Sequence, residues 1–105
     1  MTFIETSVFT RQIKNLLSAD EYQGLQLALL LRPEQGALIP NSGGLRKIRW
    51  RRQRGGKRGG IRTIYYWHGD EEVCYLLLAY SKTKRDDLTA RQLKILREIA
   101  LKEFK

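Results

Sequence analysis

One segment constrains the fold of this chain more than any other, residues 43–62, with the sequence GGLRKIRWRRQRGGKRGGIR. In its first half, apolar and basic residues alternate, so Ile48 and Trp50 fall on one side of an extended chain and cations fall on the other. The cations on that side are Lys47, Arg49 and Arg51. A glycine-rich stretch, residues 54–60, then leads to a second strand at 61–67. The segment therefore predicts a β-hairpin with one packing face and one cationic face.

The excess charge of the whole chain lies in this same segment. The 105 residues include 20 Lys plus Arg and 11 Asp plus Glu, which gives a net charge of +9. Nine of the basic residues belong to the segment: Arg46, Lys47, Arg49, Arg51, Arg52, Arg54, Lys57, Arg58 and Arg62. The other 11 are balanced by the 11 acids. Localised charge of one sign attracts polyanions, so nucleic acid is the first partner to consider.

Length and composition predict one α+β domain spanning residues 1–105. An apolar fraction of 42% argues against a disordered basic tail. No apolar run approaches the roughly 20 residues that a membrane span needs, and the first residues lack the pattern of a secretory signal. The single cysteine, Cys74, cannot form an internal disulfide, so we expect a reducing, cytoplasmic setting.

Helix signals flank the predicted hairpin. Thr6 or Ser7 can cap a first helix, and Ser18 with Glu21 has the spacing of a capping box for a second. The buried face of the second helix is predicted to comprise Tyr22, Leu25, Ala28, Leu29 and Leu31. Pro33 should end that helix, because the residue before a proline disfavours the helical conformation. The two helices are expected to form an N-terminal helical hairpin.

The rest of the chain supplies strands and a last helix. Phe3 and Ile4 predict a short strand at or next to an edge of the sheet, and the apolar run 73–80 predicts a central strand covered on both faces. Thr89, with Gln92 three positions on, can cap a C-terminal helix. The predicted order is β-α-α-β-β-β-α, an antiparallel sheet backed by helices.

The cationic strand suggests a site. Lys47 and Arg49 are two residues apart, so their side chains lie about 7 Å apart on one face, and Arg62 can approach them from the next strand. Cations held this close lower the pKa of a lysine, which can then act as a base, while arginines hold phosphate. Such a cluster could cleave RNA through its 2′-hydroxyl without a metal or other cofactor. Plain phosphate binding is the simpler alternative, and from spacing alone it is favoured.

Other candidate features are weaker. GGKRGG at residues 55–60 lacks the Ser or Thr of a nucleotide-binding loop, and Cys74 fits a small core residue. Trp50 and Tyr65 fit the core, whereas Tyr66 shares the side of Arg62 and could contact a base. A second basic group follows the third strand of the sheet: Lys82, Lys84 and Arg85.

The chain resembles the RelE/ParE toxin superfamily of bacterial toxin–antitoxin systems, and most closely its HigB-like branch. Four strings carry the likeness: GGLRKIR at 43–49, GKRGGIRTIYYW at 56–67, YLLLAYSK at 75–82 and DLT at 87–89. The resemblance implies a RelE-like fold and a toxin that cleaves messenger RNA in the ribosomal A site. It also implies a cognate antitoxin, often of HigA-like helix-turn-helix type, through which alone the toxin would reach operator DNA.

The resemblance further implies where the site lies. Lys47, Arg49 and Arg62 match cations of the family site, and Lys82 lies next to the position of a further arginine, where Thr83 stands here. RelE-type toxins place a tyrosine near the start of the last helix, where Thr89 is the nearest residue here, so the base and acid stay open. We take as candidate catalytic residues Lys47, Arg49, Arg62 and Lys82. Candidate RNA-binding residues are Arg46, Arg51, Arg52, Arg54, Lys57, Arg58, Tyr66 and Lys84.

Two other functions share this pattern. A ParE-like gyrase inhibitor has the same architecture, although a gyrase binder has no need of the Lys47, Arg49 and Arg62 cluster. The second alternative is a nucleic-acid-binding module without toxicity. Growth arrest on expression would separate that module from the toxins, and RNA cleavage would separate the nuclease from the gyrase inhibitor.

Overall fold

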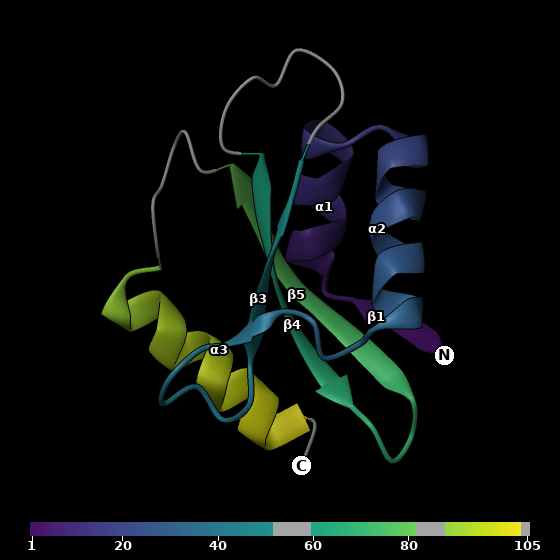
Figure 1. The fold of residues 1–105 in the computed structure, drawn as a ribbon. Coiled ribbons are helices and arrows are strands. Elements are labelled where there is room, and N and C mark those ends of the chain that lie inside the picture. Colours follow the sequence, from purple (N-terminus) through teal and green to yellow (C-terminus); the bar gives the residue numbers. More distant parts are fainter. Residues whose placement is uncertain (52–59, 82–87, 104–105) are drawn as a thin grey trace.

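The computed structural model of the chain is a five-stranded sheet with helices on both faces (Figure 1). It describes residues 1–51, 60–81 and 88–103. The elements in chain order are β1 (Thr2–Glu5), α1 (Ser7–Leu16), α2 (Ala19–Leu31), β2 (Ala37–Leu38), β3 (Arg46–Trp50), β4 (Ile61–His68), β5 (Val73–Ser81) and α3 (Ala90–Glu103). The α+β class and the predicted element order are confirmed, and β2 is an addition to them.

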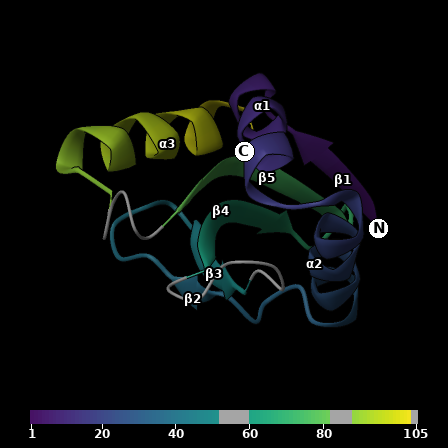
Figure 2. The same ribbon diagram turned by 90° about the horizontal axis from the view of Figure 1, so that it is seen from above.

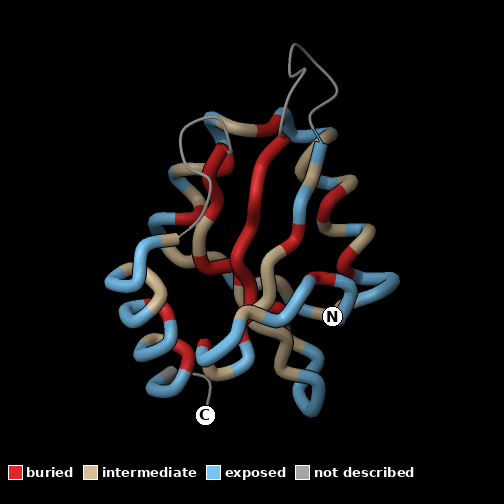
Figure 3. Tube along the Cα trace, turned by 60° about the vertical axis from the view of Figure 1, so that its left-hand side comes forward, coloured by how far each residue is buried: buried red, intermediate tan, exposed pale blue. Residues whose placement is uncertain are grey.

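The strands follow the order β1-β5-β4-β3-β2. The neighbours β3, β4 and β5 form the predicted antiparallel meander. At one edge β1 pairs with β5 in parallel, with Phe3 opposite Cys74. At the other edge the two-residue β2 pairs with β3. β4 is the third of the five strands and therefore the central one, and it is buried along most of its length (Figure 3).

The helices begin where the sequence predicts. The Thr6 hydroxyl accepts the N–H of Phe9 at 3.0 Å, and Ser18 and Glu21 form a complete capping box. The Thr89 and Gln92 side chains exchange the same pair of bonds at the start of α3. These bonds satisfy N–H groups that the first turn of a helix leaves without a partner. Pro33 follows the end of α2 at Leu31, as expected.

The helices form two layers. α1 and α2 lie together on one side of the sheet, and α3 lies on the other (Figures 1 and 2). The first layer buries Phe9, Ile13, Leu25 and Leu29 against strand residues that include Ile48 and Tyr65. The second layer buries Leu96 and Ala100 of α3 against Leu45, Ile64, Leu77 and Tyr80. Each strand residue therefore belongs to either the α1/α2 face or the α3 face.

The predicted buried face of α2 is wrong at one position. Leu31 is 73% exposed, whereas Leu25 and Leu29 are fully buried. Leu25 and Leu29 are one turn apart and share a side of the helix, but Leu31 follows Leu29 by two residues and points to another side. Of the helices in residues 1–51 and 88–103, none has the length and apolar character to cross a membrane.

Candidate functional site

Basic residues of two neighbouring strands meet on the α3 face of the sheet. Ile48 packs in the core of the other face, so its neighbours Lys47 and Arg49 point to the α3 face, and Arg62 shares that face with Ile64. The strand register places Arg49 directly opposite Arg62, and Lys47 opposite Ile64. The structure therefore brings together three of the predicted catalytic residues.

The three cations differ in exposure. Arg49 is exposed and Lys47 is half-buried, whereas Arg62 is only 7% exposed. Lys47 and Arg62 both have interaction partners within the free protein. Opposite residues in an antiparallel pair have Cβ atoms about 5 Å apart, and like charges in such a pair disfavour each other. Two arginines that face each other on one side of a sheet can together hold one phosphate.

Tyr80 belongs to the same row, and our reasoning from sequence missed it. The register places Tyr80 of β5 opposite Arg62, so that Arg49, Arg62 and Tyr80 follow one another across three strands. The side chain is 7% exposed. A phenol on the strand next to Arg62 could donate or accept a proton at a phosphate that Arg62 holds. No local pattern in the sequence predicts this placement, because it depends on a β-bulge in β5.

That bulge lies between the pairs Tyr65–Leu76 and Ile64–Leu78, where Leu77 has no partner of its own. A bulge inserts one residue and so changes which side the following residues face. Beyond it, Ala79 packs in the α1/α2 core and Tyr80 in the α3 core. A regular register would have paired Tyr80 with Ile61 and turned its ring to the α1/α2 face.

The predicted RNA-binding residues occupy several different places. Arg46 lies on the α1/α2 face, away from Lys47 and Arg49, and its Nη1 donates to the backbone oxygens of Glu34 (2.9 Å) and Gly36 (2.7 Å). Arg51 follows β3 and is exposed. Tyr66 lies on the α3 face with Arg62, as predicted. The others lie outside the described residues: Arg52, Arg54, Lys57, Arg58 and Lys84, together with the candidate catalytic residue Lys82.

Two features hold the basic strands in register. The buried Tyr65 hydroxyl donates to the oxygen of Pro33 (2.7 Å) and accepts the N–H of Gly36 (2.9 Å), which fixes the connection after α2 to the sheet. Gly60, at the start of β4, has a φ of +54°, and a Cβ there would lie 2.4 Å from the oxygen of Trp50. Only glycine allows that close approach without strain. Gly60 thus sets the position of Arg62 beside Arg49.

A set of part-buried polar groups on β1, α1 and α2 serves a structural role. Glu5 accepts hydrogen bonds from the hydroxyls of Tyr22 and Thr10, which ties β1 to α1 and α2. Burial, then the bond to Glu5, raises the pKa of Tyr22 above its ordinary range. Burial raises the pKa of Cys74 to about 12, so it is a neutral core thiol, as its sequence context predicts. Within the described residues, no group of three His, Cys, Asp or Glu side chains could hold a metal ion.

The protein is thus a small α+β domain whose sheet carries a cationic row on the α3 face. A family described as the RelE toxin of the RelE/RelB toxin–antitoxin system matches residues 6–105 of the sequence. Because the match covers nearly the whole chain, the protein belongs to the RelE toxin family. It is therefore a toxin of a toxin–antitoxin system, and the family implies an antitoxin as its partner.

A solved structure supports the fold. The chain is similar to the E. coli toxin RelE, in a variant with two arginine-to-alanine substitutions, in the free state. The TM-score is 0.58 at 12% sequence identity, and the alignment covers 81% of this chain and 86% of the other. At that identity the comparison concerns the fold alone. The expected RelE-like fold is confirmed, whereas the HigB-like branch stays a prediction.

Proposed function

We propose that this toxin is an endoribonuclease that cleaves messenger RNA in the ribosomal A site and so stops translation. The observation that carries the proposal is the row formed by Arg49, Arg62 and Tyr80, with Lys47 beside it on the same sheet face. Membership of the RelE toxin family supports it. Neighbouring cations that cost stability are expected where a polyanion must be bound and its reaction accelerated.

The proposed chemistry needs only groups of the protein and the RNA. A base removes the proton of the 2′-hydroxyl, whose oxygen attacks the adjacent phosphorus. The bond to the 5′-oxygen breaks, and an acid protonates that leaving oxygen, which yields a 2′,3′-cyclic phosphate and a 5′-hydroxyl. Arg49 and Arg62 would stabilise the charge that builds on the phosphate oxygens.

The proton-transfer roles have three candidates. Lys47 and Lys82 are the candidate bases from the sequence, and Tyr80 joins them because of its place beside Arg62. A catalytic group must lie within hydrogen-bond reach of the proton that it moves. Lys47 and Tyr80 lie in adjacent rows on the same face, on either side of β4, so a phosphate held over Arg62 would lie between them. That placement favours a division in which one acts as the base and the other as the acid.

The remaining basic residues would bind the RNA backbone. Arg51 and the basic residues of the 52–59 segment carry charge that one phosphate does not require. We assign them to messenger or ribosomal RNA phosphates, and the proposed partners are the ribosome, its messenger and a HigA-like antitoxin. If about five cations met phosphates of single-stranded RNA, log K against log salt should fall with a slope of roughly −3.5.

Primer extension on a defined messenger RNA in a purified translation system, with and without ribosomes, tests the proposal. Cuts that need ribosomes and fall within translated codons are the expected result. Arg62→Ala should lower the cleavage rate by about 10²- to 10³-fold, as the loss of a preorganised charge does. Arg62→Lys keeps the positive charge at this buried position and shows whether cleavage requires bidentate hydrogen bonding by a guanidinium group.

Arg32→Gln is the matched control, because Arg32 is exposed and lies at the end of α2, away from the basic row. It removes the same charge and should leave cleavage within about twofold. Wild-type cleavage by Arg62→Ala would refute the site. An absence of cuts in both reactions would refute the nuclease and direct attention to gyrase, which a supercoiling assay tests.

A further inference from the structure

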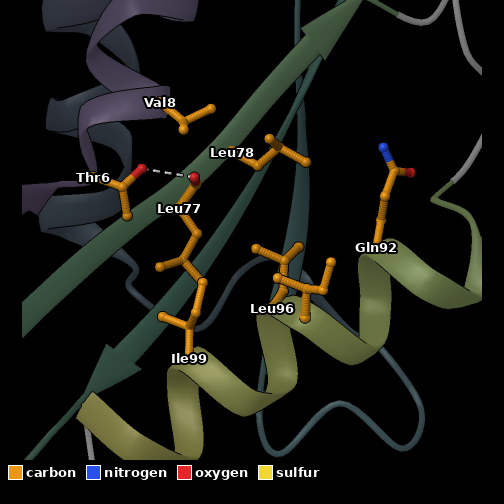
Figure 4. Close-up of a pocket in the computed structure, with 8 residues that line it drawn as sticks. Thr6, Val8, Leu77, Leu78, Gln92, Leu96 and Ile99 are labelled. Atoms are coloured by element: carbon orange, nitrogen blue, oxygen red, sulfur yellow. Dashed lines mark hydrogen bonds between the residues drawn. The ribbon is translucent and has the colours of Figure 1, made fainter.

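An apolar groove lies on the same side of the sheet as α3 but outside the basic row. It has a volume of about 220 Å³ and runs between α3, the bulged part of β5 and the first turn of α1 (Figure 4). Its principal lining residues are Val8, Leu77, Leu78, Ile95, Leu96 and Ile99. The Thr6 hydroxyl at one end donates to the oxygen of Leu77 at 2.8 Å, so its hydrogen is already used within the protein.

The groove exists because α3 packs on the sheet through one part of its apolar surface. Leu96 and Ala100 are buried in the α3 core, whereas Ile95 remains 47% exposed at the rim. On the opposite rim Val8 of α1 is 39% exposed. The bulge at Leu77 places two consecutive leucines, Leu77 and Leu78, toward this layer and gives the groove an apolar floor. The apolar lining thus continues from the sheet to solvent.

The two helices that form the walls are basic. α1 contains Arg11 and Lys14 and no acid. α3 contains Arg91, Lys94, Arg97 and Lys102 against Glu98 and Glu103. Arg91 precedes Ile95 by one turn, so the two side chains are neighbours on the helix surface. A partner that inserts an apolar side chain here would gain from carboxylates on either side of it.

The chemistry of the groove decides among possible occupants. RNA is a poor fit, because the lining offers neither cations for phosphate nor aromatic rings for bases. A second copy of this chain would bring another +9 charge against basic helices. An acidic, amphipathic segment of another protein satisfies both the lining and the rim.

We propose that this groove is a docking site for the cognate antitoxin, which inserts an apolar side chain flanked by carboxylates. The inference rests on the toxin having an antitoxin partner, which the family implies, and not on the proposed RNA cleavage. The toxin would then have two separate surfaces. The basic row acts on RNA, and the groove between α1 and α3 binds the antitoxin.

The test measures the affinity of the purified toxin for its purified antitoxin by isothermal titration calorimetry. Ile95→Asp and Val8→Asp each put a carboxylate into the groove from an exposed position, so the fold should survive, and Val8 lies in the first turn of α1, where an acid is favourable. Each should raise the Kd at least about tenfold, since one buried apolar anchor commonly contributes that much. Higher salt should raise the Kd of the wild-type toxin.

Leu101→Asp is the matched control. Leu101 lies on the same helix and is 43% exposed, but it faces Gly43 and does not line the groove. This variant should keep the Kd within about twofold, and circular dichroism melts should show that all three variants are folded. In cells, antitoxin co-expression should rescue growth with Leu101→Asp and fail to rescue it with Ile95→Asp.

Three results would overturn the inference. One is wild-type affinity in both groove variants, and another is an equal loss of affinity in Leu101→Asp. The last is a toxin dimer in sedimentation that becomes monomeric in the groove variants, which would assign the groove to a second copy. Because affinity is read directly, a toxin that failed to cleave RNA would refute the proposed function and leave this test valid.

Discussion

Replacing Arg49 with glutamine should make the protein more stable and less active at the same time. Arg49 is exposed and lies directly opposite Arg62, which is 7% exposed. Glutamine keeps a long polar side chain on β3 and removes one of the two facing charges. The substitution therefore relieves a repulsion in the free protein and removes a group that the proposed reaction needs.

The magnitude follows from the geometry of the pair. Like charges directly opposite in an antiparallel sheet destabilise it by about 0.2–1 kcal/mol. For a domain of this size, 1 kcal/mol corresponds to roughly 4–5 °C in Tm. We therefore expect Tm to rise by about 1–5 °C and the cleavage rate to fall about 10²-fold.

Thermal melts at low and high salt, together with the ribosome-dependent cleavage assay, measure both effects. The gain in Tm should shrink in 1 M salt, where the Debye length falls to about 3 Å and the exposed charge of Arg49 is screened. Arg32→Gln, which removes a charge with no facing arginine, should give no such gain. A fall in Tm, or a gain that salt does not alter, would refute the argument from repulsion. Unchanged cleavage would remove Arg49 from the site.

Further predictions concern single groups. Tyr80→Phe should lower the cleavage rate by about 10- to 10²-fold and leave RNA affinity unchanged if the hydroxyl moves a proton, and an unchanged rate would exclude it from the chemistry. Tyr65→Phe should cost about 2 kcal/mol in urea unfolding, because the N–H of Gly36 and the oxygen of Pro33 lose their partner; a loss below about 0.5 kcal/mol would contradict this. Burial raises the pKa of Cys74 from 9.0 to about 12, so the folded state holds a proton that the unfolded state releases. Stability should therefore decline as pH rises above about 9, with a smaller decline in Cys74→Ala, and an identical pH profile in the two proteins would count against the shift.

Much of the fold follows from local sequence signals. The capping residues Thr6, Ser18 and Thr89 begin helices as predicted, because each bond joins groups only three residues apart. The alternation in β3 correctly separates Ile48 from Lys47 and Arg49, because side chains of a strand alternate with a period of two. Arg62 could be placed near them because one hairpin connects the two strands.

Other features depend on contacts between distant residues and could not be predicted. The parallel pairing of β1 with β5 joins Phe3 to Cys74, and no local pattern specifies the direction of that pairing. The alternation puts Arg46 on the face of Ile48, but its hydrogen bonds to the backbone oxygens of Glu34 and Gly36 depend on the path of the connection after α2. The apolar run 73–80 conceals its bulge, since leucines on both sides of β5 look alike in sequence.

That bulge links the two surfaces proposed here. Up to Leu76 the residues of β5 pair with β4 in one register, and the extra Leu77 shifts every later pair by one. The shift places Tyr80 opposite Arg62 and completes the row, and it also turns Leu77 and Leu78 together toward α3. Bulges re-aim side chains at a cost in sheet regularity, so they are expected where function requires it. One irregular residue thus forms both the edge of the proposed cleavage site and the floor of the proposed antitoxin groove. Tyr80 of the row and Leu78 of the groove are two residues apart on β5, so an antitoxin held in the groove would lie near the proposed cleavage site.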